Sequence, residues 1–189
     1  SKSNFLKIRI DQAIGLIPSH LDVVIIGYYA DFYSAGIYRI AKKLVDPINY
    51  LVVAFSPWML SKIEKINFRY LTLKILFPMS IVLVAFYTLI GEYLINLVAG
   101  IDFSESYSPM LFLLMGYLSY LIFFWTRHYL FLNNLILRHT IARLINVFVF
   151  IISSSLLIKT FSYNGIAISI SLGMIVQKIY EIFAYYRNK

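Results

Sequence analysis

Residues 75–99 have the sequence ILFPMSIVLVAFYTLIGEYLINLVA, in which Glu92 is the single charged residue. A helix needs about 20 apolar residues to cross the roughly 30 Å hydrocarbon core of a bilayer. This stretch therefore predicts a transmembrane helix. The same composition recurs on both sides of it, and further spans are predicted at residues 12–30, 36–60, 109–132, 141–159 and 164–184. Together these spans predict an all-α, polytopic membrane protein with six transmembrane helices.

The overall composition supports a membrane location. Of the 189 residues, 60% are hydrophobic and 14% are charged, against about 25% charged in a soluble domain. A soluble domain of this size cannot bury so much apolar surface. Lipid is therefore expected to be the solvent for most of the chain.

The charges of the connecting segments alternate along the chain. Basic residues lie in the N-terminal tail, after the second span, after the fourth span and at the C-terminus: Lys2, Lys7, Arg9, Lys62, Lys65, Arg69, Lys74, Arg138, Arg143, Arg187 and Lys189. The loops after the first and third spans are acidic, with Asp31 in one and Asp102 and Glu105 in the other. The loop after the fifth span carries Lys159 and is the exception to this alternation. Because basic loops stay cytoplasmic, both termini are predicted to lie on the cytoplasmic side of the membrane and the acidic loops on the outer side.

This topology also explains the formal net charge of +8. Basic residues at the cytoplasmic face are attracted by anionic lipid headgroups, so nucleic acid is not expected as a partner. The chain contains no cysteine, and its three histidines have no carboxylate or cysteine at a metal-ligand spacing. Neither a metal nor a cofactor is expected.

The chain begins with Ser1 and has neither a signal peptide nor a nucleotide-binding motif such as GxxxxGK[ST]. Many transporters consist of two related six-helix bundles around a site at the middle of the membrane. Residues 1–189 are therefore expected to form one domain, a single bundle of a longer transporter.

A stripe of charged residues follows one face of the second predicted span. Arg39, Lys42, Lys43, Asp46 and Tyr50 occupy positions i, i+3, i+4, i+7 and i+11 of a helix. Charges inside a membrane usually face a water-filled cavity or a charged partner. The stripe therefore predicts a binding site for a ligand with phosphate or carboxylate groups. A structural alternative stays open, in which Arg39 extends to the headgroups and Asp46 neutralises the two lysines.

Two further charges inside spans are candidates. Asp22 lies in the middle of the first span, close to His20, and predicts either a coupling site for a proton or cation or an ion pair with a cation of the second span. Arg127, near the cytoplasmic end of the fourth span, is a weaker candidate for contact with substrate. Asp11 and Lys178, near span ends, are expected to be interfacial.

Residues 20–48, HLDVVIIGYYADFYSAGIYRIAKKLVDPI, combine an apolar helix containing Asp22 with a short loop and a Gly-x-Tyr-x-x-Ala pattern at Gly36, Tyr38 and Ala41. The segment FSPWMLSKI, residues 55–63, then precedes a basic loop. This arrangement resembles the start of the C-terminal half of polysaccharide flippases in the multidrug/oligosaccharidyl-lipid/polysaccharide exporter superfamily. The resemblance implies two facing six-helix bundles, of which this chain is the C-terminal one.

The resemblance also implies a function. Such proteins flip an undecaprenyl-diphosphate-linked oligosaccharide across the inner membrane for synthesis of O-antigen, capsule or exopolysaccharide, and they are transporters rather than enzymes. The implied partners are the lipid-linked substrate, the N-terminal six-helix half, and the polysaccharide polymerase with its chain-length machinery. Three alternatives stay open: a cation-coupled drug or metabolite antiporter of the same superfamily, a membrane-embedded glycan polymerase or ligase, and a structural subunit without a site.

Overall fold

The computed structural model describes residues 2–62 and 67–188, and 94% of the chain is helical. Neither of these two ranges contains a β-strand. The predicted all-α class is therefore confirmed. In chain order the elements are α1 (Lys2–Tyr29), α2 (Phe32–Val45), α3 (Pro47–Lys62), α4 (Phe68–Leu71), the π-helical turn η1 (Thr72–Leu76), α5 (Phe77–Ala99), the 3-10 turn η2 (Ile101–Ser106), α6 (Tyr107–Ile122), α7 (Phe124–Leu132) and α8 (Ile136–Tyr186).

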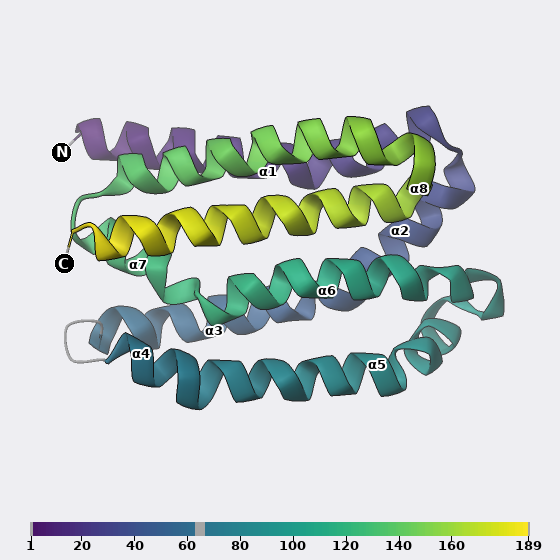
Figure 1. Cartoon of the computed structure of the whole chain (residues 1–189), viewed down its shortest axis with the longest axis horizontal. Helices are drawn as coiled ribbons and strands as arrows, with labels where there is room; N and C mark the ends of the chain where they lie inside the picture. The colour runs from purple at the N-terminus through teal and green to yellow at the C-terminus, as the bar shows by residue number, and fades with distance from the viewer. Residues whose placement is uncertain (1, 63–66, 189) are drawn as a thin grey trace.

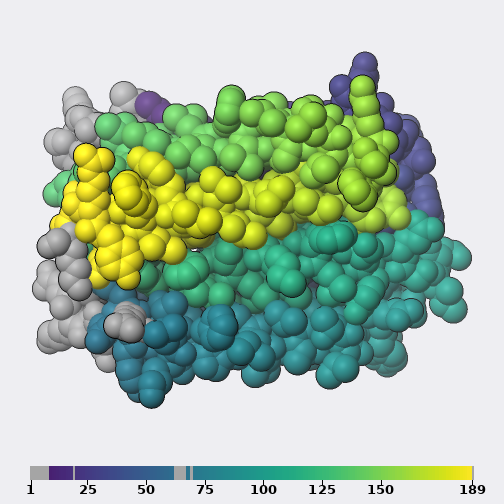
Figure 2. Space-filling model, in the orientation of Figure 1, coloured from purple at the N-terminus to yellow at the C-terminus, as the bar shows by residue number. Residues whose placement is uncertain are grey.

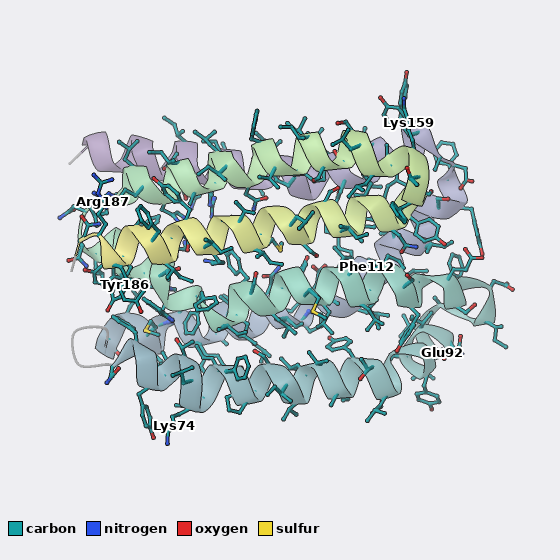
Figure 3. All side chains as sticks on the ribbon, viewed as in Figure 1. Lys74, Glu92, Phe112, Lys159, Tyr186 and Arg187 are labelled. Atoms are coloured by element: carbon teal, nitrogen blue, oxygen red, sulfur yellow. The ribbon has the colours of Figure 1, made fainter. Side chains whose placement is uncertain are left out.

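The helices lie side by side along the long axis of the molecule, and the chain turns back at both ends (Figure 1). The N- and C-termini lie at the same end. Figure 3 shows Lys74, Tyr186 and Arg187 at this end, with Glu92 and Lys159 at the opposite one. The arrangement matches the alternation of loops expected from the sequence, with Lys159 again the exception.

Several predicted spans are interrupted helices in the structure. Residues 36–60 fall on α2 and α3, which are separated at Asp46 because Pro47 supplies no N–H to continue the ladder. Residues 109–132 fall on α6 and α7, which meet at Phe123 with a bend of 41°. The last two predicted spans both lie in α8, which contains a non-helical residue, Ser162, with φ +48° and ψ −130°. The chain reverses there, so α8 has a first arm, residues 136–161, and an antiparallel second arm, residues 163–186 (Figure 1).

Three helical segments are long and apolar enough to cross a membrane: Arg9–Tyr29, Thr72–Ala99 and Ile136–Tyr186. The bent pair Ile101–Ile122 and Phe124–Leu132 gives a fourth candidate if it counts as one span. The described part of the chain therefore has three to four candidate spans, and the crossing of six helices stays a prediction.

The outer surface of the bundle is apolar. On α5, the side chain of Leu89 is 82% exposed, and Val82, Leu97 and Val98 are each about two-thirds exposed. Contiguous apolar surface of this extent is not found on soluble monomers, and water cannot solvate it favourably. The structure is therefore compatible with an integral membrane protein whose helices face lipid.

Close helix contacts hold the bundle together on its inner side. The second arm of α8 packs along α6 (Figure 2). At this contact a Cβ added to Gly116 would lie 2.7 Å from Cα of Ser171, and the Ser171 hydroxyl donates a 2.6 Å hydrogen bond to the Phe112 carbonyl oxygen. Where lipid is the solvent, helices associate mainly through such close approach of small residues and through hydrogen bonds between helices.

We expect Gly116→Ala to destabilise the bundle, because the new methyl group would meet backbone rather than a flexible side chain. Forcing atoms into a packed contact costs about 1–3 kcal/mol. Gly27→Ala is the matched control, since a Cβ at Gly27 has no atom within 4 Å. Thermal unfolding of both variants in detergent measures the difference, and equal midpoints would contradict the role of Gly116.

Candidate functional site

The helix that carries the charged stripe is fixed at its start by an N-cap. Asp31 has extended backbone geometry and accepts a 2.6 Å hydrogen bond from the Ser34 N–H, which satisfies one of the free donors of the first turn of α2. The same hydrogen bond lowers the pKa of the Asp31 carboxyl below its usual value. Asp31 therefore sets where α2 begins and, with it, the position of the charged residues further along the helix.

Four of the five residues of the predicted stripe line one pocket, and Tyr50 does not. Its volume is about 350 Å³, and it is formed between α1 and α2 with its wall made by His20, Val23, Arg39, Lys42, Lys43 and Asp46. We call it the cationic pocket. The side chains of Arg39 and Lys43 are exposed at this pocket, and those of Lys42 and Asp46 are partly buried.

Asp22 is fully buried behind the cationic pocket. Its carboxylate forms an ion pair with Lys42, and the same oxygen accepts a 2.9 Å hydrogen bond from the Tyr38 hydroxyl. The structure therefore places Asp22 in an ion pair across the α1–α2 hairpin, one of the two roles that its position predicts. Asp22 neutralises the charge of Lys42. The other charges of the pocket are the positive charges of Arg39 and Lys43 and the negative charge of Asp46.

A second polar cavity lies further along the bundle towards the end with the termini. Its volume is about 410 Å³, and its polar wall includes Asn49, Tyr117, Arg127, His128, Arg143, Asn146 and Gln177. We call it the second cavity. Arg127, the weaker candidate from the sequence, lines this cavity and not the cationic pocket, and its guanidinium lies 5.5 Å from the centroid of the Phe131 ring.

The two cavities are connected through one hydrogen bond. Tyr117, which lines the second cavity, donates a 2.9 Å hydrogen bond to Asp46 of the cationic pocket. Asn49, another residue of the second cavity, lies at the start of α3, about one helical turn after Asp46. The Tyr117–Asp46 hydrogen bond therefore links polar residues that line the two cavities.

A buried group of charges near the end with the termini was not predicted from the sequence. It joins α1 and both arms of α8 and consists of Asp11, His139, Lys178 and Glu181. The expectation that Asp11 and Lys178 are interfacial is wrong, because their exposed fractions are 0% and 1%. The sequence held one signal for this group: Lys178 and Glu181 are spaced i, i+3 on the last span, which suits an ion pair on one helix face.

In the described ranges, no group of His, Asp and Glu side chains has an arrangement that could hold a metal ion. The side chains that line the two cavities include charged groups and hydrogen-bonding groups. Such a set can bind and release a charged ligand, and it can bind a proton.

Comparisons of the chain with protein-family models, with curated proteins and with solved structures find no match. The chemistry of the two cavities is consequently the basis for proposing a function.

Proposed function

We propose that this chain is one six-helix bundle of a transporter that moves a lipid-linked oligosaccharide with a diphosphate group across a bacterial inner membrane. The observation that supports the proposal most directly is the cationic pocket, in which Arg39 and Lys43 are available to a ligand while Lys42 is held by Asp22. The resemblance of residues 20–48 to polysaccharide flippases suggests the same class of substrate.

A diphosphate can leave water only where fixed positive charge and hydrogen-bond donors replace its hydration. Arginine and lysine make short, charge-assisted hydrogen bonds with phosphate oxygens, and these are roughly twice as strong as neutral ones. In the cationic pocket, Arg39 and Lys43 supply such donors within about one turn of α2. The polyprenyl chain of the substrate must stay in lipid, and the apolar outer face of the bundle allows this.

In the proposed protein all six predicted spans cross the membrane, with both termini cytoplasmic and with the acidic turns outside. A second bundle, the N-terminal half implied by the resemblance, completes the cavity. Rocking of the two bundles around the pocket would expose it first to one side of the membrane and then to the other. The polymerase and chain-length machinery of the same polysaccharide are the proposed downstream partners.

A cation-binding antiporter is the second candidate, and the charge distribution disfavours it. A cationic substrate needs an available carboxylate, but Asp22 is fully buried against Lys42, and Asp46 accepts a hydrogen bond from Tyr117. The positive charge of Arg39 and Lys43 would also repel a cation. The pocket suits an anionic ligand better.

Deletion of the gene tests the proposal. We expect the strain to lose its surface polysaccharide and to accumulate complete lipid-linked repeat units on the cytoplasmic face of the inner membrane. A plasmid-borne copy of the wild-type gene should restore both. Unchanged polysaccharide with increased sensitivity to toxic cations would favour an antiporter, and unpolymerised units on the outer face would favour a glycan polymerase or ligase.

A further inference from the structure

The buried charges near the end with the termini are arranged around His139. One of its partners is the carboxylate of Glu181, which lies 3.0 Å from His139 Nδ1. The same carboxylate lies 2.7 Å from Lys178 Nζ and 2.9 Å from Gln177 Nε2, and it accepts a hydrogen bond from the Thr126 hydroxyl. An ionised carboxylate can only accept hydrogen bonds, so the Nδ1 of His139 carries a hydrogen. In the neutral imidazole, the other ring nitrogen, Nε2, is therefore an acceptor.

The acceptor Nε2 faces a second acceptor. It lies 3.7 Å from Oδ2 of Asp11 on α1, and both side chains have an exposed fraction of 0%. Within the described part of the chain, neither of these two atoms has a hydrogen-bond partner. Unsatisfied buried polar atoms are costly. A proton bound at Nε2 would remove this cost, since Nε2–H could then donate to the Asp11 carboxylate.

The charges that face His139 come from every element packed around it. They are Asp11 from α1, His128 from α7, Arg143 from the first arm of α8, which also carries His139, and Lys178 and Glu181 from the second arm. With both carboxylates ionised and His139 and His128 neutral, the two negative charges balance those of Arg143 and Lys178. Binding of one proton gives the cluster a net charge of +1.

Arg143 connects this cluster to the second cavity. Its Nη1 lies 3.4 Å from Asp11 Oδ2 and donates a 2.5 Å hydrogen bond to the Asp11 main-chain oxygen, and the same side chain lines the cavity. Gln177 makes a similar link, because it donates to Glu181 and also lines the cavity. An anion in the cavity would offset the charge of the bound proton and attract Arg143 away from Asp11.

We propose that His139 and Asp11 form a proton-binding site that is coupled, through Arg143, to an anion in the second cavity. A hydronium ion donates the proton: its O–H bond breaks, the Nε2–H bond forms and a water molecule is left. The imidazolium then donates an Nε2–H···Oδ2 hydrogen bond from α8 to α1 once the 3.7 Å separation shortens. Because coupling between two sites is reciprocal, the anion is bound more tightly at lower pH, and its binding draws in a proton. The identity of the anion as a diphosphate headgroup rests on the proposed function, but the proton site does not.

The experiment is a pH titration of the His139 imidazole by NMR in the intact protein, purified and placed in lipid nanodiscs. The signal is assigned by its loss in His139→Gln, and pyrophosphate is the anionic probe. We expect His139 to titrate, and saturating pyrophosphate to raise its midpoint by about one pH unit, a tenfold gain in proton affinity. Asp11→Asn should lower proton affinity about tenfold or more, because it removes the charge that faces Nε2.

Two further variants distinguish coupling through Arg143 from a general effect of substitution on the fold. In Gly15→Ala the added Cβ would lie 2.8 Å from Cζ of Arg143, so it should displace the guanidinium from Asp11 and raise the midpoint without pyrophosphate. Lys159→Ala removes an exposed charge at the opposite end of the molecule and should leave the His139 midpoint unchanged, with and without pyrophosphate.

Absence of any titration of His139, with or without pyrophosphate, would overturn the proton site. The titration is repeated in the Arg39→Ala and Lys43→Ala double variant, which removes the donors of the cationic pocket. A midpoint unchanged by pyrophosphate that calorimetry shows to be bound to this variant would overturn the coupling. Failure of pyrophosphate to bind would contradict the proposed function and the coupling together, whereas a titration that still depends on Asp11 would support the proton site by itself.

Discussion

Export of the lipid-linked oligosaccharide is expected to fall at least about a hundredfold when Arg39 and Lys43 are both replaced by alanine. Hydrogen bonds to charged groups contribute about 1.5–3 kcal/mol each, and 1.4 kcal/mol corresponds to a factor of ten. Both side chains are exposed at the cationic pocket, so their removal should affect the ligand more than the fold. The measurement is surface polysaccharide in the deletion strain carrying the variant, with the amount of protein in the membrane determined in parallel.

The matched control is the double variant Lys74→Ala and Lys159→Ala. It removes the same formal charge from two exposed lysines at opposite ends of the molecule (Figure 3), neither of which lines the pocket. We expect this control to export normally. Normal export by the Arg39 and Lys43 double variant, at normal protein levels, would show that the stripe is structural and would contradict the proposed function.

The largest expected loss of stability follows from Asp22→Ala. The variant leaves Lys42 without its carboxylate and removes the acceptor of the Tyr38 hydroxyl, which is itself buried. Breaking a buried ion pair by removing one partner costs about 3–5 kcal/mol. Because the Lys42 side chain is 18% exposed and can partly regain water from the pocket, we expect a loss near the lower limit of this range.

A double-mutant cycle measures the pair directly. Asp22→Ala combined with Lys42→Met should recover part of the stability lost in Asp22→Ala, because the charge that interacted with Asp22 is then removed as well. Unfolding in mixed detergent micelles gives the free energies. Additive losses would contradict the ion pair. A variant Asp22→Asn that folds normally but no longer transports would instead favour the coupling role that the sequence left open.

The membrane character and the helical class could be predicted from the sequence because they depend on composition over windows of about 20 residues. The stretch 75–99 contains enough apolar surface to specify its own environment, whatever it packs against. The charged stripe was also predictable, since positions i, i+3, i+4 and i+7 of any helix share a face. The structure places Arg39, Lys42, Lys43 and Asp46 on one pocket for this local reason.

Contacts between residues distant in the sequence could not be predicted in this way. Asp11 and Lys178 resemble interfacial charges when each is considered by its place in a span, but their buried environment is created by helices that arrive from other parts of the chain. Likewise, no proline marks the 41° bend between α6 and α7 at Phe123, and the cavity that Arg127 lines is formed with residues of α1, α3 and α8.

By itself, therefore, the sequence determined the apolar character of this protein, its helices and the face on which α2 carries its charges, since all three follow from local composition and helical period. Only the tertiary structure decided which charges are paired, which remain available to a ligand and which two acceptors face each other inside the bundle. Asp22 meets Lys42, and Asp11 meets His139, across contacts formed by packing of separate helices. Electrostatic interaction depends on distance and burial in three dimensions, and a linear pattern specifies neither.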